Sequence, residues 1–190
     1  MVLAAGDSRR MGQTKQLLPL GGRTLLDTVL AAARGARLDE LVLVLGAEAE
    51  RIAAAVDTAG ARVVVAADHA EGMGASLRAG VGALGPEVER VVVLLGDQPR
   101  VTAELVDAVL ERHLESGLPA AAVSAGGVLQ PPVAADRRLW PQLIAARGDS
   151  GLRSVLRAVP GIVATLSVEG VTVDIDTPDD YRRVLMTEER

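Results

Sequence analysis

The sequence contains no cysteine and only two aromatic residues, Trp140 and Tyr181, in a chain of 190 residues. Without cysteine the chain can form no disulfide, no thiolate zinc site and no thiol nucleophile, which fits a reducing compartment and predicts a cytoplasmic protein. Because phenylalanine is also absent, leucine, valine and alanine are expected to fill the core. Aromatic platforms for stacking are too few to predict binding of single-stranded nucleic acid.

Long apolar runs and an excess of positive charge are absent as well. No apolar run approaches about 18 residues, and Met1–Gly6 lacks the basic region of a signal peptide, so neither membrane insertion nor export is expected. The formal net charge is −5, and the 20 basic residues are scattered, which predicts no binding of DNA or RNA. Lys15 is the only lysine among these basic residues.

The residues that are present predict a folded α/β domain. Hydrophobic residues make up 49% of the chain, and its length suits a single domain, 1–190, at roughly 100 to 200 residues per domain. Short β-branched or leucine-rich runs alternate with longer amphipathic segments, which is typical of βαβ units around a mostly parallel sheet. Strands are expected at 1–5, 41–45, 62–66, 91–95, 120–124, 162–168 and 171–175, and helices at 23–37, 48–59, 75–84, 103–116, 139–146, 152–158 and from 178 onward.

Some positions carry more specific expectations. Five apolar residues at 91–95 predict the central strand. Thr102 is expected to cap the following helix. Gly126-Gly127 predicts a hairpin turn, and Gln130-Pro131-Pro132 is expected to break the chain. His69, in a loop, and His113, inside a helix among charged residues, are both expected at the surface.

The first loop has the composition of a phosphate-binding loop. Ligands of parallel α/β sheets bind beyond the carboxyl ends of the strands. Small residues there let backbone amides approach phosphate oxygens, while Arg9, Arg10 and Lys15 supply positive charge. A tight surface turn with solvated arginines is the alternative. The loop reads Leu3-Ala4-Ala5-Gly6-Asp7-Ser8-Arg9-Arg10-Met11-Gly12-Gln13-Thr14-Lys15.

Two later loops carry carboxylates. Asp97 directly follows the central strand, where a carboxylate suits magnesium, an ion held by one or two carboxylates plus substrate phosphates. Asp174 and Asp176 alternate along an expected strand end, so only one should share a site with Asp97, and Asp176, nearer the loop, is favoured. Alternatively, Asp97 belongs to a proline-containing turn, and Asp176 merely precedes a helix whose amino end favours negative charge.

A further segment places Gly72, Gly74 and Ser76 at the start of a helix. Backbone amides there are available to contact a base or a ribose, although a glycine-punctuated helix cap is an equally good explanation. Taken in order, all these segments resemble the MobA-like nucleotidyltransferase family, and most closely its molybdenum cofactor cytidylyltransferase branch. The matching motifs are Leu3-Ala4-Ala5-Gly6-x-Ser8-x-Arg10-Met11-Gly12-x-x-Lys15, Gly72-Met73-Gly74-x-Ser76-Leu77-Arg78-x-Gly80, Gly96-Asp97-Gln98-Pro99 and Asp174-Ile175-Asp176-Thr177-Pro178.

The resemblance implies a three-layer α/β/α Rossmann-like fold and the transfer of CMP from CTP to molybdenum cofactor with release of pyrophosphate. It implies Lys15, Arg10 and Asp97 as catalytic residues and a magnesium ion on Asp97 and Asp176. A molybdoenzyme that receives the product is an implied partner; nucleic acid and membranes are not. The implied nucleotide-binding residues are Leu3, Ala4, Ala5, Gly6, Ser8, Arg9, Gly12, Lys15, Gly72, Gly74 and Ser76.

Two departures from the family pattern bear on the site. Asp7 places a negative charge inside the phosphate loop, where it is expected to weaken triphosphate binding. Gln130-Pro131-Pro132-Val133 replaces the family's usual Gly-x-Pro or His-Pro, which leaves acceptor recognition open. The alternatives are therefore a guanylyl- or sugar-phosphate nucleotidyltransferase of the same fold, or a nucleotide-binding regulatory or chaperone-like module that performs no transfer.

Overall fold

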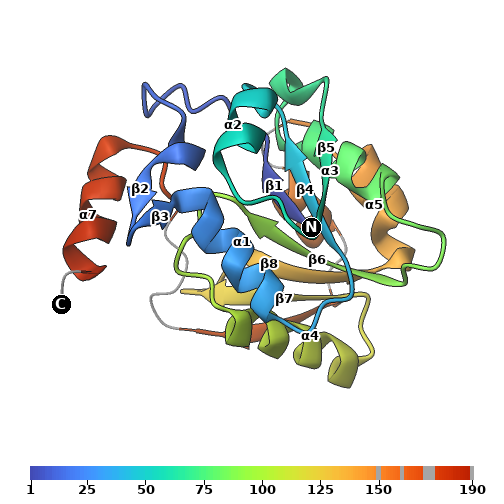
Figure 1. Ribbon diagram of the computed structural model, residues 1–190. Helices are drawn as coiled ribbons and strands as arrows, with labels where there is room; N and C mark the ends of the chain where they lie inside the picture. The colour runs from blue at the N-terminus through green and yellow to red at the C-terminus, as the bar shows by residue number, and fades with distance from the viewer. Residues whose placement is uncertain (149–150, 159–160, 169–173, 189–190) are drawn as a thin grey trace.

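The computed structural model describes residues 1–148, 151–158, 161–168 and 174–188. Within these ranges, seven strands form one sheet in the order β5-β4-β1-β6-β8-β7-β9 (Figure 1). β8 is antiparallel to both its neighbours, and the other neighbouring pairs are parallel. The expected mostly parallel mixed sheet is confirmed, with β6 at its centre. The strands are β1 (Val2–Ala4), β4 (Leu41–Leu45), β5 (Ala61–Val65), β6 (Arg90–Leu95), β7 (Ala120–Ala125), β8 (Val128–Asp136) and β9 (Val163–Ser167).

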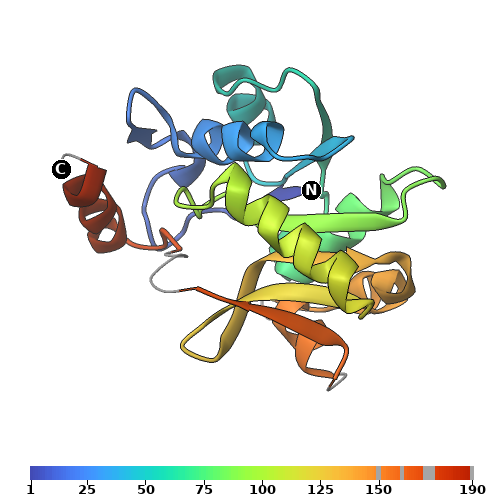
Figure 2. The ribbon, with the colours of Figure 1, turned by 90° about the horizontal axis from the view of Figure 1, so that it is seen from below.

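Helices cover both faces of this sheet, which confirms the expected three-layer α/β/α arrangement. α1 (Leu25–Gly35), α2 (Ala49–Ala55) and α4 (Ala103–Ser116) pack on one face, and Figure 2 shows α1 and α4 side by side. The other face is covered by α3 (Met73–Gly82), α5 (Trp140–Ala145) and α6 (Gly151–Ala158). Short 3₁₀ helices are η1 (Lys15–Leu17), η2 (His69–Glu71) and η3 (Arg137–Leu139).

Two separate apolar cores follow from the alternation of side chains along buried strands. In β6, Val92 and Leu94 face the cluster with α1 and α4, whereas Val91 and Val93 face the cluster with α3 and α6. A strand buried on both faces must be apolar at every position, which explains its continuous valine and leucine run. Thr102 caps α4 as expected, because its hydroxyl accepts a hydrogen bond from the backbone amide of Leu105 at 3.3 Å.

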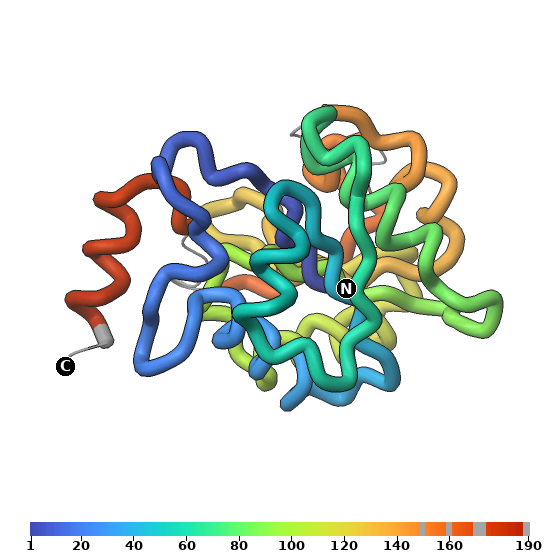
Figure 3. Tube along the Cα trace, turned by 45° about the horizontal axis from the view of Figure 1, so that its top comes forward, coloured from blue at the N-terminus to red at the C-terminus, as the bar shows by residue number. Residues whose placement is uncertain are grey.

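The C-terminal helix lies apart from the sheet. α7 (Pro178–Glu188) packs beside a short hairpin of β2 (Pro19–Leu20) and β3 (Arg23–Thr24), which the sequence did not predict because each strand has only two residues. The segment after β1 and the segment before α7 lie side by side although they are far apart in sequence (Figure 3). A third apolar cluster joins them: Met11, Leu18, Leu20, Leu25, Ile175 and Val184.

The structure corrects the expected chain break at Gln130-Pro131-Pro132, which lies inside β8. Proline cannot donate a ladder hydrogen bond, so strands accept it only at edges or bulges. Here the register of β7 against β8 jumps from Ala122 opposite Val133 to Val123 opposite Gln130, which leaves both prolines without a paired residue. The bulge lets one continuous strand carry two prolines.

Two further expectations differ from the structure. Of the strand expected at 171–175, residues 171–173 lie outside the described residues, and Asp174 and Ile175 are not in a strand. His113 was expected at the surface but is only 4% exposed, because it continues the inward-facing row of Val106 and Val109 along α4. Among the helices that the structure describes, none combines the length and the apolar character needed to cross a lipid bilayer.

Candidate functional site

A cavity of about 580 Å³ opens at the edge of the sheet where β1 and β6 end. This is the edge at which parallel α/β sheets bind ligands. Of the residues expected to bind nucleotide or metal, most line this cavity, and two, Gly12 and Gly74, do not. Those that do are Leu3, Ala4, Ala5, Gly6, Ser8, Arg9, Arg10, Lys15, Gly72, Ser76, Asp97 and Asp176.

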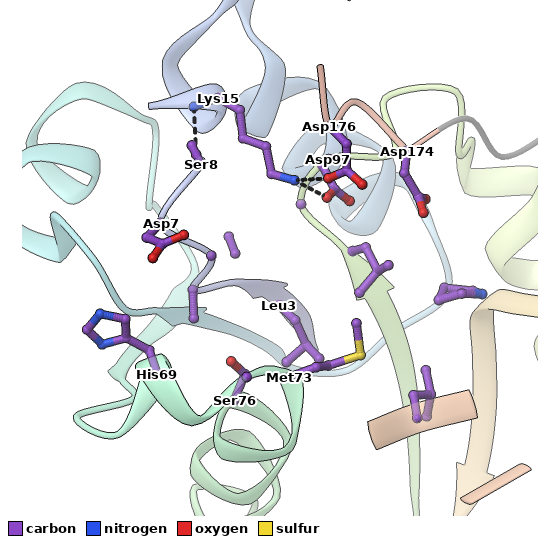
Figure 4. A pocket seen from close by; sticks show the side chains of 18 of the residues that line it. Leu3, Asp7, Ser8, Lys15, His69, Met73, Ser76, Asp97, Asp174 and Asp176 are labelled. Carbon is purple, nitrogen blue, oxygen red and sulfur yellow. Dashed lines mark hydrogen bonds and ion pairs between the residues drawn. The ribbon is translucent and has the colours of Figure 1, made fainter. Parts of the chain in front are cut away.

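Lys15 joins the two acidic loops inside the cavity (Figure 4). Its Nζ lies 2.5 Å from Asp97 Oδ2 and 3.0 Å from Asp176 Oδ1. The side chains are 13%, 17% and 32% exposed for Lys15, Asp97 and Asp176 respectively, so the pair with Asp97 is largely withdrawn from water. Arg10 reaches the other oxygen of Asp176 from the solvent side, with Nη2 2.9 Å from Oδ2. The structure thus brings residues 10, 15, 97 and 176 into one ionic network.

Burial and charge perturb the two central groups. Burial raises the pKa of Asp97, Lys15 opposes that rise, and the neighbouring carboxylates of Asp174 and Asp176 add to it. Burial alone would lower the pKa of Lys15, but the charge of Asp97 and the hydrogen bonds to Asp97 and Asp176 outweigh it, so the pKa is raised. Lys15 therefore carries its positive charge at neutral pH.

Backbone and side-chain hydrogen bonds hold the two acidic loops together. The amide of Ile175 donates to the carbonyl of Asp97 at 3.0 Å, and Gln98 Nε2 donates to Asp174 Oδ1 at 2.6 Å. Both Asp174 and Asp176 line the cavity, contrary to the expectation that only one would lie near Asp97. Alternation between faces applies to strands, and this segment is not one.

The loop after β1 is held by one buried glutamine that sequence reasoning missed. Gln16 is 2% exposed, and its Nε2 donates to the carbonyls of Ala4 at 3.0 Å and Gly6 at 2.9 Å. Its Oε1 accepts from Ser8 Oγ at 3.2 Å, and Ser8 Oγ accepts from the Lys15 amide at 3.0 Å. The side chain thus fixes both the loop and the start of η1. Its apolar neighbours in sequence, Leu17 and Leu18, gave no sign of a polar role.

Asp7 lies in this loop at the cavity wall and pairs with Arg9, with Oδ2 2.5 Å from Arg9 Nε. Both side chains are exposed, at 39% and 80%, so the pair is screened by water. Asp7 therefore offsets the charge of the cation beside it, while Arg10 and Lys15 pair with carboxylates across the cavity.

The two glycines outside the cavity have structural roles. A Cβ on Gly74 would lie 2.4 Å from the carbonyl oxygen of Ala146, so glycine lets α3 approach the end of α5. The Gly74 amide donates to the carbonyl of Gly148 at 3.1 Å. Gly12 closes a turn in which its amide donates to the Ser8 carbonyl at 3.2 Å. Gly12 and Gly74 thus lie outside the cavity lining, and their contact with a nucleotide stays a prediction.

The rest of the cavity lining is more apolar and includes residues to which the sequence assigned no part in the site. His69 lies at the rim, with Nδ1 3.1 Å from the Ala66 carbonyl, so this histidine is half-buried rather than free in solvent. β8 runs antiparallel and therefore begins at this edge, which brings its proline bulge to the wall. The remaining lining residues on this side are Met73, Leu95, Leu129, Gln130, Pro131, Leu152, Arg153 and Leu156.

The donor set fits a hard divalent cation. Asp97 Oδ1 is buried and accepts no hydrogen bond from the residues that the structure describes, which leaves one carboxylate oxygen available beside Asp176. Within the described part of the chain, no three histidine or acidic side chains gather in a ready-made metal cage. A magnesium ion held by two carboxylates needs substrate phosphates to complete its shell, which matches a cavity with Arg9 and Arg10 at its wall.

Comparisons with known proteins identify a domain family whose activity suits a cavity that holds cations and carboxylates. The MobA-like NTP transferase domain matches residues 1–163. Nicotine blue oxidoreductase of Paenarthrobacter nicotinovorans is 34% identical over 97% of this chain and 95% of its own length. Purine catabolism protein PucB of Bacillus subtilis (strain 168) is 32% identical over 96% of this chain and 93% of its own. The activity or pathway in each name is that of the relative.

A solved relative extends the similarity to the whole fold. Rv0371c from Mycobacterium tuberculosis H37Rv superposes with a TM-score of 0.87 at 34% identity, covering 97% of this chain and 95% of that chain. Its structure in complex with manganese gives a TM-score of 0.85 at 33% identity, covering 98% and 96%. The manganese complex is a property of that relative.

Proposed function

Because the chain belongs to the MobA-like NTP transferase domain family and is a nucleotidyltransferase, we propose that it transfers CMP from CTP to molybdenum cofactor, a small phosphorylated acceptor, and releases pyrophosphate. It would do so as one domain spanning 1–190 in the cytoplasm, and a molybdoenzyme would receive the product. The observation that carries the proposal is the meeting of Lys15 with Asp97 and Asp176 in a cavity that Arg9 and Arg10 also line.

The reaction needs alignment more than acid or base catalysis. An oxygen of the acceptor phosphate attacks the α-phosphorus of CTP, and the bond from that phosphorus to the bridging oxygen breaks, so its electron pair leaves with pyrophosphate. A phosphate monoester is already ionised near neutral pH, with a second pKa of about 6, so no side chain has to remove a proton. Lys15 and the loop at 6–10 would stabilise the negative charge that grows on the leaving group.

The carboxylates of Asp97 and Asp176 would hold a magnesium ion, and the manganese complex of Rv0371c supports a divalent ion in this fold. Such an ion, when bound, neutralises phosphate charge and orients the triphosphate. The start of α3, with Gly72, Gly74 and Ser76, would contact the nucleobase. Ser76 lies across the cavity from Lys15 (Figure 4). The apolar wall that includes Pro131 and Leu156 is left for the body of the acceptor.

The test is pyrophosphate release from purified protein with magnesium, each of CTP, GTP, ATP and UTP, and either molybdenum cofactor or a sugar 1-phosphate. We expect release that requires CTP and molybdenum cofactor. Lys15→Ala and Asp97→Asn should each lower turnover by roughly 100- to 1,000-fold. Equal turnover with all four nucleotides would contradict the cytidylyl assignment, and wild-type turnover in either variant would contradict the assigned roles.

The same assay separates the second candidate, a module that binds nucleotide without transferring it. The ion pair of Asp7 with Arg9 favours this candidate, because it offsets one of the charges available to a triphosphate. A non-catalytic module would be stabilised by nucleotide, by about 2.7 kcal/mol at 100 times its dissociation constant, yet release no pyrophosphate with any acceptor.

A further inference from the structure

Lys15 is bonded to the two carboxylates that would hold the divalent ion. Its Nζ lies 2.5 Å from Asp97 Oδ2 and 3.0 Å from Asp176 Oδ1, and its side chain is only 13% exposed. Figure 4 shows the ammonium group pointing at both acidic side chains and away from the loop at residues 7 and 8. The positive charge of Lys15 therefore pairs with the same two carboxylates that a divalent ion would bind.

A divalent ion and the ammonium group compete for these oxygens. Magnesium binds carboxylate oxygens at about 2.0–2.1 Å and demands their lone pairs. The ammonium group already donates into those lone pairs, and two positive centres on the same oxygens repel each other in a partly buried site. Lys15 holds Asp97 Oδ2, while the buried Oδ1 accepts no hydrogen bond from any described part of the chain. With Lys15 in this position, the site would bind a free divalent ion poorly.

Movement of the Lys15 side chain alone would free the two carboxylate oxygens that it holds, Asp97 Oδ2 and Asp176 Oδ1. The Lys15 backbone is fixed, because its amide donates to Ser8 Oγ at 3.0 Å and η1 begins at this residue. The same loop carries Arg9 and Arg10 and lines the cavity, so the phosphates of a bound nucleotide would lie within the reach of a lysine side chain. A triphosphate offers the ammonium group more negative charge than the two carboxylates together.

We propose that Lys15 is an internal cation that closes the divalent-ion site until a nucleoside triphosphate draws it away, so that metal and nucleotide bind cooperatively. The inference rests on the proposed function only in placing the ion on Asp97 and Asp176. It requires neither CTP nor any particular acceptor. Inorganic triphosphate is therefore a sufficient probe, and nucleobase preference plays no part in the test.

Because Lys15 is the only lysine in the chain, selective ¹³C labelling of lysine gives one reporter signal in the wild-type protein. We expect saturating magnesium alone to leave the Lys15 ¹³Cε resonance in place. Inorganic triphosphate, with or without magnesium, should shift it. A magnesium-only shift as large as the triphosphate shift would overturn the proposal, as would a resonance that neither probe moves.

Manganese binding to triphosphate-free protein, measured by electron paramagnetic resonance, gives an independent test. Lys15→Met and Lys15→Gln should each bind manganese about 10-fold or more tightly than the wild type, a coupling within the usual range for linked sites. Inorganic triphosphate should tighten manganese binding strongly in the wild type and much less in these variants. Arg10→Gln is the matched control, because it removes an exposed cation from the same Asp176, and it should gain less.

The two tests keep this proposal separate from the proposed function. The proposal that Lys15 closes the divalent-ion site is called the lysine gate. If Lys15→Met and Lys15→Gln bind manganese more tightly than the wild type but no cytidylyl transfer occurs, the lysine gate stands and the substrate assignment fails. If cytidylyl transfer occurs but wild type and Lys15→Met bind manganese equally without triphosphate, the gate is wrong. Asp97→Asn should abolish binding in every background, and retention of binding there would place the ion elsewhere and overturn the gate.

Discussion

At the scale of single residues, the choice of lysine at position 15 follows from the space between two carboxylates. An ammonium group is a compact point charge with three rotatable donors, whereas a guanidinium presents a rigid planar fork. Lys15 serves Asp97 and Asp176, which come from different loops, with one nitrogen atom. In a chain whose other basic residues are arginines, this position is the one where a point charge replaces the fork.

Gln16 is the residue whose replacement should separate loop geometry from charge. Gln16→Met keeps the volume but removes both donors to the carbonyls of Ala4 and Gly6. The loop should then lose its fixed geometry, and small displacements of aligned groups are costly in group transfer, so we expect kcat/KM for the nucleotide to fall by roughly 10- to 100-fold. Steady-state kinetics with varied nucleotide and saturating acceptor measure this.

Gln98→Met is the control for Gln16, because both amides are buried beside the cavity and only Gln16 holds the loop after β1. Nucleotide affinity measured without metal should fall for Gln16→Met and stay near wild type for Gln98→Met. Gln16→Glu keeps an acceptor for Ser8 but cannot donate, so it should resemble Gln16→Met. Wild-type affinity in both Gln16 variants would mean that the loop holds its shape without this side chain.

Sequence reasoning found residues whose chemistry shows in their own identity and spacing. Asp97 follows the end of β6 and Lys15 belongs to the segment that follows β1, and the edge of a parallel sheet brings such connecting segments together. Gln16 and Gln98 are uncharged amides whose roles depend on which distant backbone or side-chain atom they meet. The close approach of Gly74 to the Ala146 carbonyl was not predictable, because a glycine that admits a ligand and a glycine that admits a neighbouring carbonyl look alike in sequence.

At the scale of elements, an expectation held where the local sequence pattern was sufficient and failed where the outcome depended on packing or strand pairing. The strand at 91–95 was predictable because continuous apolar residues fit a strand covered on both faces. The prolines of β8 predict a break from sequence alone, because the bulge that accommodates them depends on the pairing with β7. His113 was misplaced because its sequence neighbours are charged, while its helical neighbours Val106 and Val109 are buried.

The burial of His113 in α4 predicts a pH dependence of stability. Burial lowers its pKa, with nearby Arg90 and Arg138 acting in the same direction against Asp136 and the Leu118 carbonyl. The folded protein therefore binds a proton less readily than the unfolded chain. The contribution of neutral His113 to the free energy of unfolding is complete above the unfolded pKa of about 6.5. It is lost as the pH falls through the lowered pKa of the folded state.

Urea unfolding of wild type and His113→Gln between pH 7.5 and pH 5 measures this contribution. We expect the free energy of unfolding to fall more steeply with acid in the wild type, by at most about 1.4 kcal/mol per pH unit for one group. The difference between the two curves isolates the histidine from the carboxylates that both proteins share. Parallel curves would show that His113 takes up its proton equally well in both states.

At the scale of the whole molecule, the described residues form three apolar clusters with different roles. Two lie on opposite faces of the sheet and hold the layers together, and this arrangement followed from the alternation of strands and helices in the sequence. The third joins the loop after β1 to the C-terminal helix, and its members are spread over most of the chain. No local sequence pattern predicts this cluster, because its contacts link segments about 160 residues apart in the chain.

The third cluster should control the site without dominating the stability of the sheet. Val184 of α7 is 1% exposed within it, beside the segment that carries Asp176. Val184→Ala removes two methyl groups and leaves a cavity, at a cost of about 1–3 kcal/mol. Because that loss loosens α7 against the β2–β3 hairpin, we expect manganese affinity in the presence of inorganic triphosphate to fall several-fold.

Val109→Ala is the matched control, since Val109 is fully buried in α4 against the sheet, in a different cluster. Thermal unfolding should show a lowered Tm in this variant, while manganese and triphosphate bind the folded protein as in wild type. Equal affinity losses in both valine variants would mean that packing anywhere in the fold reaches the site. A loss of manganese affinity confined to Val184→Ala would show that α7 holds Asp176 against Lys15 and Arg10, which lie near the opposite end of the sequence.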